Sequence, residues 1–230
     1  MKAVVLLSGG LDSTTMLKMV QSQGYIVTAL TFEYGQRHHV EVVAAREIAQ
    51  RYGIIDHRIA QIDLRVFGGS ALTDNSIPLN KNTSKSSCDT NFENIPTSYV
   101  PARNTIFLSY AIGLAEVIMA SKVFIGINAI DYSGYPDCRP EYLKSFNDMS
   151  KLATAVGIKN ELQIEVVAPL LYLSKAEIIK IGMQLKIDYS QTISCYDPTP
   201  LKAACGKCDA CILRLAGFAM NNLKDNAVYC

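Results

Sequence analysis

The sequence predicts an α/β protein built on a doubly wound parallel sheet, with a small cysteine-bearing segment at its C-terminus. The first observation behind this prediction is a continuous apolar and β-branched run over residues 3–7, which is typical of a strand buried on both faces of a parallel sheet. The second is that strand-like runs alternate with segments whose apolar residues recur at helical spacing, the order that gives an α/β fold. The third is a cluster of four cysteines between residues 195 and 211.

The N-terminal part of the sequence predicts two strand–helix units and a third strand. Strands are expected over residues 3–7 and 25–32, and a weaker one over 54–62. A helix that ends at Gly24 lies between the first two strands, and a helix over 37–52 lies between the second and the third. This order implies right-handed crossovers and a parallel sheet covered on both faces.

Residues 67–101 are polar, rich in Asn, Ser, Thr, Gly and Pro, and show no periodicity. A connection of this length is too long for an ordinary loop, so we expect an excursion at the active site or a mobile lid. Helix, strand, helix and strand are then expected over residues 105–120, 122–127, 141–156 and 164–167. Ser174 and Glu177 have the spacing of a capping box that opens a further helix toward Leu185.

Composition limits the class of protein. Of the 230 residues, 49% are hydrophobic and 19% are charged, which indicates a compact protein rather than a disordered chain. The net charge of +1 argues against a protein whose main partner is nucleic acid. No apolar stretch approaches the roughly 18 residues that span a bilayer, and the run over 3–7 is too short for a signal peptide. We expect a cytoplasmic chain without a membrane partner, with an α/β domain over 1–190 and a C-terminal segment over 191–230.

The turn between the first strand and the first helix, Ser-Gly-Gly-Leu-Asp-Ser-Thr, is suited to holding phosphate. Its glycines let the backbone approach an anion, and the free N–H groups of the first helical turn point toward it. The sequence lacks the lysine of a γ-phosphate-binding loop and the glycine pattern of a dinucleotide-binding loop. The alternative is a turn that serves structure alone. The candidate nucleotide-binding residues are Leu7, Ser8, Gly9, Gly10, Leu11, Asp12, Ser13, Thr14 and Thr15.

Two further groups of polar residues stand near expected strand or helix ends. Gln36, Arg37 and His38 follow the second strand, and the carboxyl ends of parallel strands line the ligand crevice of such a sheet. We expect these three residues near the nucleotide, with a solvated first helical turn as the alternative. Arg103 precedes a helix, where it either binds phosphate or is solvated.

The loop over residues 131–140 mixes aromatic, acidic and basic side chains. A planar heterocycle is recognised by a stacking ring and by a carboxylate that accepts hydrogen bonds from ring N–H and amino groups, and an arginine can bind a substrate carboxylate with two hydrogen bonds. The alternative is a turn rich in Gly and Pro that has only a structural role. The candidate substrate-binding residues are Asp131, Tyr132, Tyr135, Asp137 and Arg139.

The C-terminal segment carries the spacing Cys-x9-Cys-x2-Cys-x2-Cys. Four thiolates close a tetrahedral Zn²⁺ site and leave no open position, so the predicted zinc is structural. An iron–sulfur cluster is the main alternative, but the ferredoxin spacing requires a cysteine where Leu215 stands. A segment without metal is the third alternative. The predicted ligands are Cys195, Cys205, Cys208 and Cys211, and we expect Lys202, Lys207 and Arg214 to offset their charge.

These motifs together resemble a known family. The turn over residues 8–14 is similar to the pyrophosphate loop of the N-type ATP pyrophosphatases, whose fold is adenine nucleotide alpha hydrolase-like and which transfer AMP to a carboxylate or carbonyl oxygen. That loop, the segments over 34–38 and 131–140, and the cysteine cluster resemble the 7-cyano-7-deazaguanine synthase family in order and spacing. The resemblance covers residues 7–211, which is nearly the whole chain.

The resemblance implies an ATP-dependent ligase that converts 7-carboxy-7-deazaguanine and ammonia into 7-cyano-7-deazaguanine, in the synthesis of the queuosine precursor for tRNA modification. It implies adenylated and amide intermediates, structural Zn²⁺, ATP with Mg²⁺ as co-substrate, and a homodimer. Asp12 is expected to help place magnesium, and the expected catalytic residues are Asp12, Ser13, Arg103 and Arg139. We expect ammonia from solution or from a partner, because one α/β domain and a zinc segment leave no room for a glutaminase domain. The general base stays unassigned from the sequence.

Two other classes of function stay open at this point. One is a tRNA-modifying sulfurtransferase or lysidine-type ligase. Both need extra domains and a basic surface to hold tRNA, which the charge of +1 opposes. Sulfur transfer also needs reactive cysteines, and Cys88 and Cys138 in polar loops keep this class open. A non-catalytic nucleotide-sensing module is opposed by the substrate-like loop over 131–140. Measuring ATP turnover with and without substrate separates an enzyme from a sensor.

Overall fold

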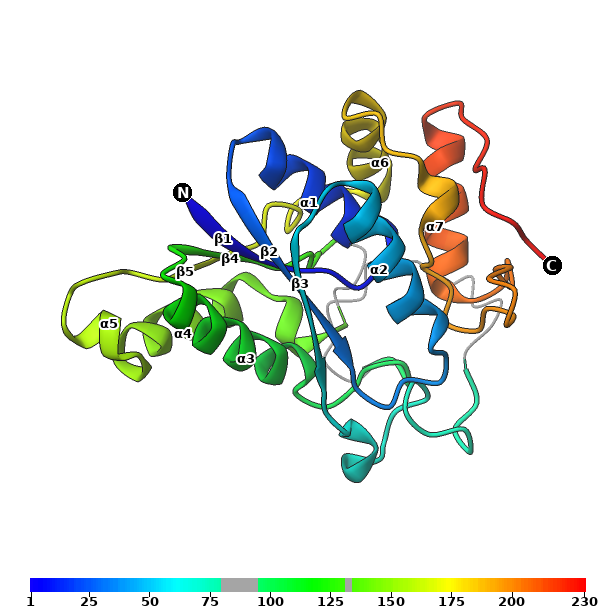
Figure 1. Ribbon diagram of the computed structural model, residues 1–230. Coiled ribbons are helices and arrows are strands. Elements are labelled where there is room, and N and C mark those ends of the chain that lie inside the picture. The colour runs from blue at the N-terminus through cyan, green and yellow to red at the C-terminus, as the bar shows by residue number, and fades with distance from the viewer. Residues whose placement is uncertain (80–94, 131–133) are drawn as a thin grey trace.

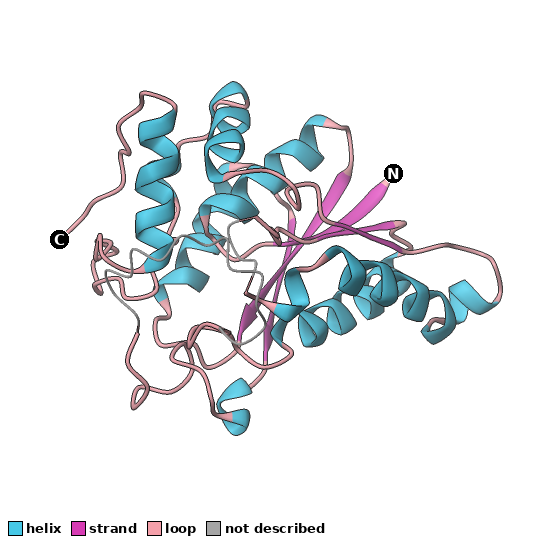
Figure 2. Ribbon diagram, turned by 180° about the vertical axis from the view of Figure 1, so that it is seen from behind, coloured by secondary structure: helices cyan, strands magenta, loops and turns pink. Residues whose placement is uncertain are grey.

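The computed structural model describes residues 1–79, 95–130 and 134–230. Its centre is a five-stranded parallel sheet with the strand order β3-β2-β1-β4-β5 (Figures 1 and 2). The strands are β1 (Lys2–Leu6), β2 (Ile26–Glu33), β3 (Asp56–Gln61), β4 (Lys122–Phe124) and β5 (Glu165–Val167). The predicted α/β class and the parallel sheet are confirmed.

Helices cover both faces of the sheet (Figure 1). One face carries α1 (Leu11–Ser22), α2 (Val40–Arg51), α6 (Lys175–Gln184) and α7 (Asp209–Met220). The other face carries α3 (Arg103–Ile118), α4 (Pro140–Ala153) and α5 (Ala155–Ile158). Three short 3-10 helices, η1 (Leu64–Phe67), η2 (Pro136–Cys138) and η3 (Tyr189–Gln191), lie in the connections.

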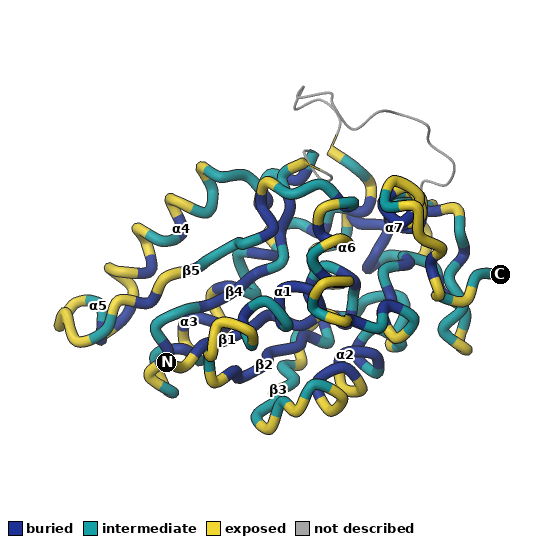
Figure 3. The backbone as a smooth tube through the Cα atoms, turned by 90° about the horizontal axis from the view of Figure 1, so that it is seen from above, coloured by how far each residue is buried: buried dark blue, intermediate teal, exposed yellow. Residues whose placement is uncertain are grey.

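The central strand β1 shows why the sheet needs both layers. Val4 packs into the core beneath α3, whereas Ala3 and Val5 pack into the core beneath α1, α2 and α6. Side chains of a strand alternate between the two faces, so a strand buried on both sides must be apolar throughout. Figure 3 shows β1 and β2 largely buried between the layers, while α4 and α5 expose much of their surface.

The chain reverses its direction of travel across the sheet at β1. From β1 the chain moves through α1 to β2 and then β3, whereas β4 and β5 lie on the other side of β1 and connect through the opposite layer. The connections after β1 and β4 therefore leave toward opposite faces. Such a switch point creates a crevice at the carboxyl ends of the strands.

Most of the predicted elements are present, with two main differences. The helix predicted over 141–156 is two helices, because Thr154 adopts an extended conformation and its hydroxyl accepts a hydrogen bond from the N–H of Gly157, which starts α5. The capping box of Ser174 and Glu177 is confirmed. Helix α7 has no counterpart in the elements predicted from the sequence.

The polar excursion over 67–101 is partly packed against the core. Leu72 and Val100 are buried in the cluster beneath α3, and the N–H of Ala71 donates to the carbonyl of Thr97 across the excursion. Residues 80–94, which form its middle, lie outside the described residues. Among the helices that the structure describes, we find none long and apolar enough to cross a membrane.

Candidate active site and metal centre

A cavity of about 240 Å³ opens at the switch point, between the residues that follow β1 and those that follow β4. Its walls also include the end of β2, the first turns of α2 and α3, and the segment over 193–196. The sequence-predicted residues that line it are Leu7, Ser8, Gly10, Leu11, Asp12, Ser13, Gln36, Arg103 and Tyr135. The fold therefore brings together residues that are about 130 positions apart in the sequence.

The conformation of the turn after β1 is held by Gly9 and Ser13. Gly9 has a φ of +82°, and a Cβ atom there would stand 2.7 Å from both the amide nitrogen of Ala45 and the carbonyl oxygen of Glu41. The turn therefore needs glycine for its conformation and for its contact with α2. Ser13 locks the other side, because its hydroxyl donates to the Gly10 carbonyl over 3.1 Å and accepts from the N–H of Ser8 over 3.2 Å.

Helix α1 begins at Leu11, so its N-terminus faces the cavity. The N–H of Leu11 donates to the Ser194 hydroxyl over 3.2 Å, and the N–H of Ile193 donates to the Gly9 carbonyl over 2.9 Å. The C-terminal segment thus holds the turn from outside. The free N–H groups and the dipole of a helix N-terminus stabilise an anion, which suits this end of the cavity to phosphate.

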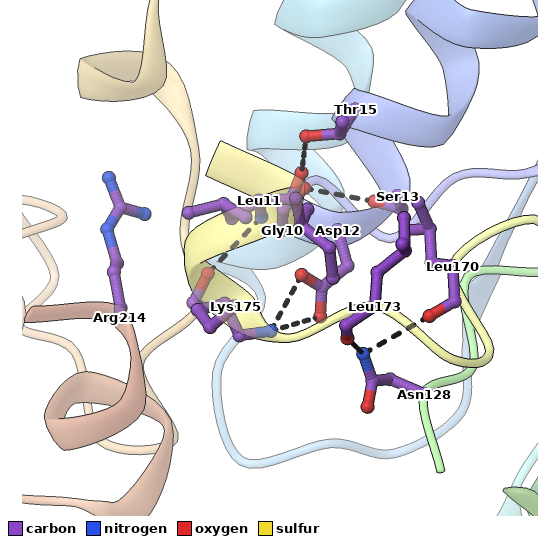
Figure 4. A network of polar contacts seen from close by, with 12 residues as sticks. Gly10, Leu11, Asp12, Ser13, Thr15, Asn128, Leu170, Leu173, Lys175 and Arg214 are labelled. Carbon is purple, nitrogen blue, oxygen red and sulfur yellow. Dashed lines mark hydrogen bonds and ion pairs between the residues drawn. The ribbon is translucent and has the colours of Figure 1, made fainter. Parts of the chain in front are cut away.

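Asp12 forms an ion pair that the sequence analysis missed. The ammonium nitrogen of Lys175 lies 2.7 Å from both carboxylate oxygens of Asp12 (Figure 4). The two side chains are 8% and 19% exposed for Lys175 and Asp12, so little water screens them. Lys175 is the first residue of α6, directly after the cap Ser174. The only sequence signal at this lysine was the capping box around it.

A second group of ionisable side chains lines the cavity wall at the end of β2 and the starts of α2 and α3: Tyr34, Glu41 and Arg103. Burial raises the pKa of Tyr34 to about 12 and that of Glu41 to about 7, and the positive charge of Arg103 partly opposes both shifts. Burial alone lowers the pKa of Arg103, but Coulombic attraction to Tyr34 and Asp137 outweighs burial and raises it. Arg103 is therefore a permanent cation at the cavity wall.

Tyr135 and Asp137 have different positions relative to the cavity. Tyr135 lines it, and its hydroxyl shares a 2.7 Å hydrogen bond with Ser98. Asp137 is buried outside the lining, where one of its oxygens accepts from the N–H of Asn104 over 3.0 Å at the start of α3. Its other oxygen is buried without a hydrogen-bond partner. Asp137 thus holds the start of α3 and acts electrostatically on Arg103.

Arg139, the other described residue predicted in the substrate loop, does not line the cavity. Arg139 is the N-cap of α4, and its Nε donates to the carbonyl of Pro136 over 3.0 Å. Asp131 and Tyr132 lie outside the described residues. Phe107 and Asn128 line the cavity although the sequence analysis did not select them.

Thr14 and Thr15 are fully buried behind the turn, outside the cavity lining. The hydroxyl of Thr14 donates to the Gly10 carbonyl over 2.8 Å, and that of Thr15 lies 2.7 Å from the hydroxyl of Tyr189. Both hydroxyls are therefore occupied within the protein. The structure gives these threonines a role in fixing α1 on the turn rather than a place at the cavity wall.

Arg37 and His38 are also outside the cavity lining. The guanidinium of Arg37 donates to the backbone carbonyls of Asp74 over 2.9 Å and Ile77 over 2.7 Å, which fastens the polar excursion to the start of α2. His38 Nε2 lies 3.4 Å from a carboxylate oxygen of Asp197. Sequence position alone placed these side chains near the nucleotide, whereas packing turns them toward neighbouring loops.

The predicted metal ligands converge. The Sγ atoms of Cys195, Cys205, Cys208 and Cys211 all lie within 4.8 Å of one another and are buried. Backbone N–H groups donate to the sulfurs of Cys195, Cys205 and Cys208 over 3.2–3.4 Å, from residues 196, 197, 205, 207 and 208. Such donors stabilise thiolates, and Cys208 caps α7 so that a helix N-terminus points at the cluster. The arrangement can hold a metal ion.

Two of the basic residues expected to offset the thiolate charge are engaged elsewhere. Arg214 is buried and pairs with Asp225 over 2.6 Å, while Lys202 pairs with Glu47 on α2. Arg214 also donates to the carbonyls of residues 189 and 192. Arg214 therefore connects α7 to residues 189–192, which precede the first cysteine of the cluster. Backbone N–H groups take over part of the charge compensation.

Comparisons with known proteins agree with this arrangement. The family model described as Queuosine biosynthesis protein QueC matches residues 2–222. Relatives named 7-cyano-7-deazaguanine synthase include that of Syntrophotalea carbinolica, 53% identical over 229 residues (99% of this chain, 96% of the relative), and that of Pseudomonas aeruginosa, 50% identical over 229 residues (99% and 98%). A solved structure of NMN synthetase from Francisella tularensis is 16% identical with a TM-score of 0.49, over 97% of this chain and 77% of that one, and is too distant to add to the argument.

The match extends over nearly the full length of the chain and of its relatives. It includes the turn after β1, the walls of the cavity and all four cysteines, so it does not rest on one motif. The family resemblance expected from the sequence motifs is confirmed. The chain belongs to the family of queuosine biosynthesis protein QueC.

Proposed function

We propose that this protein is an ATP-dependent ligase that makes 7-cyano-7-deazaguanine from 7-carboxy-7-deazaguanine and ammonia. The observation that carries the proposal is the convergence of the turn after β1, Asp12 and Arg103 on one cavity, with Lys175 paired to Asp12 from outside the lining, in a chain about half identical to synthases of that name. These are the groups that an adenylation of a carboxylate requires.

The turn after β1 and the N-terminus of α1 hold the pyrophosphate part of ATP. Ser8 and Ser13 add hydroxyl donors, and Lys175 adds a positive charge beside the phosphates. Asp12 is the residue that would hold Mg²⁺, because a hard divalent cation takes carboxylate oxygens as ligands. When bound, the ion neutralises charge on the leaving pyrophosphate.

The deazaguanine ring occupies the part of the cavity next to Tyr135 and Phe107, where aromatic faces allow stacking. Arg103 meets the substrate carboxylate there, as a permanent cation in a half-buried position. Asp131 and Tyr132 stay predicted ring contacts. Asp137 is proposed to act through Arg103, because it lies behind the start of α3.

The same site activates the substrate twice. In the first round a carboxylate oxygen attacks the α-phosphorus of ATP, pyrophosphate leaves, and ammonia displaces AMP to give the primary amide. The amide still holds one oxygen, so a second ATP adenylates that oxygen, and loss of AMP then leaves the nitrile. The ring does not change between the rounds, which lets one set of ring contacts serve both.

The four-cysteine centre is proposed to hold Zn²⁺ as a structural ion. Tetrathiolate sites leave no coordination position for substrate, and their metal contributes to folding. Its place in the molecule fits that role, since Ile193 and Ser194 beside Cys195 hold the turn after β1. We further propose a cytoplasmic homodimer without a nucleic-acid or membrane partner, and a boundary near residue 190 between the α/β domain and the zinc segment.

The test of the proposed function is an analysis of products. The protein is given ATP, Mg²⁺, ammonium and 7-carboxy-7-deazaguanine, and all products are identified by mass spectrometry. We expect the nitrile, with two AMP and two pyrophosphate formed per nitrile, because the turn lacks the lysine of a γ-phosphate-transfer loop. Synthetic amide without ammonium is expected to give the nitrile with one AMP. ADP as the stoichiometric product, or an inert amide, contradicts the proposal.

A further inference from the structure

One acidic side chain at the cavity, that of Glu41, is not assigned a role by the proposed function. Glu41 lies in the first turn of α2, half-buried, and lines the cavity. It shares the cavity wall with Arg103, the residue proposed to bind the substrate carboxylate, and the charge of Arg103 acts on it. Its backbone carbonyl abuts Gly9 of the phosphate-binding turn. The residues proposed to bind ATP and the ring leave the carboxyl group of Glu41 without an assigned role.

The other ionisable groups of the wall are poor proton acceptors. Among the described residues that line the cavity, the carboxyl groups are those of Asp12 and Glu41. Both oxygens of Asp12 already lie 2.7 Å from the Lys175 ammonium. Burial raises the pKa of Cys138 to about 12 and that of Tyr34 also to about 12, so both keep their protons at neutral pH.

We propose that Glu41 is the proton acceptor for the nitrogen in both rounds of the reaction, an assignment that rests on the proposed function. In the first round the nitrogen of ammonia forms a bond to the adenylated carbon and gives one proton to the Glu41 carboxylate. The C–O bond to AMP breaks, and AMP leaves with its electron pair. In the second round the amide nitrogen loses two protons, one as its oxygen is adenylated and one as AMP leaves and the nitrile forms. Glu41 accepts these in turn and passes each to water.

The surroundings of Glu41 suit this work. Burial raises its pKa to about 7, and the positive charge of Arg103 on α3 limits the rise. Tyr34 at the end of β2 faces it as well and stays neutral. A general base is most effective when its pKa lies near the pH at which the enzyme works, since it is then ionised yet basic enough to take a proton.

The test separates adenylation from the nitrogen step. Exchange of labelled pyrophosphate into ATP, with 7-carboxy-7-deazaguanine and without ammonium, reports adenylation alone. Glu41→Gln is expected to keep this exchange within about threefold of wild type, while amide formation with ammonium falls by about 10²-fold or more. Glu41→Asp keeps a carboxylate on a shorter side chain and is expected to recover part of the loss.

The pH profile gives a second readout that a structural role does not move. With synthetic amide as substrate, ammonium does not titrate in the assay. The kcat/KM of the wild type is expected to rise with pH and level off above about 7, and Glu41→Gln is expected to lose that rise. Glu47→Gln, an exposed glutamate on the same helix, is the control and keeps the wild-type profile.

Three outcomes overturn the assignment. If exchange and amide formation fall together in Glu41→Gln, the residue shapes the site and does not accept the protons. If neither falls, another group is the base. If the wild type itself makes no nitrile, the proposed function fails and the assignment of Glu41 fails with it. This outcome is measured on the wild type alone, so it is distinct from the two outcomes measured on the variants.

Discussion

The metal centre and the cavity share the segment over 193–196 but are built in opposite ways. The four cysteines that can hold a metal all lie within residues 195–211, and backbone N–H groups of the same stretch donate to three of the sulfurs. The cavity takes its polar groups from several separate segments of the chain, such as Asp12 on α1, Glu41 on α2 and Arg103 on α3. One site is local and closed, and the other is dispersed and open.

The two sites also treat buried charge differently. At the metal centre each thiolate meets donors or neighbouring ligands, which favours a stable site. Near the cavity, one oxygen of Asp137 behind the wall has no hydrogen-bond partner, and at the wall partial burial disfavours the charge of Glu41. Such groups cost folding free energy and persist where the chemistry needs them. Changes at the metal centre should therefore act first on stability, and changes at the cavity first on activity.

The largest effect is expected for loss of a metal ligand. Cys205→Ser should release the metal and lower the free energy of unfolding by more than about 4 kcal/mol, because metal binding and folding of the segment are linked. Metal analysis and thermal denaturation measure both. Cys230→Ser is the control, since Cys230 is exposed and outside the cluster. A Cys205→Ser protein that keeps its full metal content would show that the cluster is not the metal site.

A smaller loss of stability, with a complete loss of activity, is expected at the Asp12–Lys175 pair. Lys175→Met leaves a largely buried carboxylate without its cation and should lower stability by about 3 kcal/mol. Combining it with Asp12→Asn removes both charges and should restore most of that stability, but no AMP formation. Urea unfolding of the two single variants and the double variant measures the coupling. Additive losses would mean that the two residues do not depend on each other.

The smallest effect, and one of opposite sign, is expected for Glu41→Gln in the absence of substrates. The pKa of Glu41 is raised by burial from its ordinary 4.5 to about 7, so the unfolded chain ionises first and stability is lost as pH rises from about 4.5 to 7. Glutamine avoids this loss. The variant should be more stable than wild type by roughly 2–3 kcal/mol at pH 8 and nearly equal to it at pH 4.5. A variant that is less stable at pH 8 would refute the buried-charge interpretation.

The sequence alone predicted best those sites whose residues lie close together along the chain. The cysteine spacing identified the residues that converge, and the Ser-Gly-Gly-Leu-Asp-Ser-Thr turn identified the residues around Gly9 that meet the cavity. The strands were predictable for the same reason, because burial on both faces demands an unbroken apolar run such as residues 3–7. In each case the spacing along the chain already fixes the geometry.

Tertiary structure decided which polar side chains share the cavity. Lys175 is 163 positions from Asp12 and stood out in the sequence only as part of a capping box, yet the packing of α6 beside α1 brings the two together. Arg37 follows the correct strand but is drawn away by the carbonyls of a loop some 40 residues later. The periodicity of a sequence indicates which face of a helix or strand is buried. The residue that pairs with a buried charge depends instead on how separate helices and strands pack against each other.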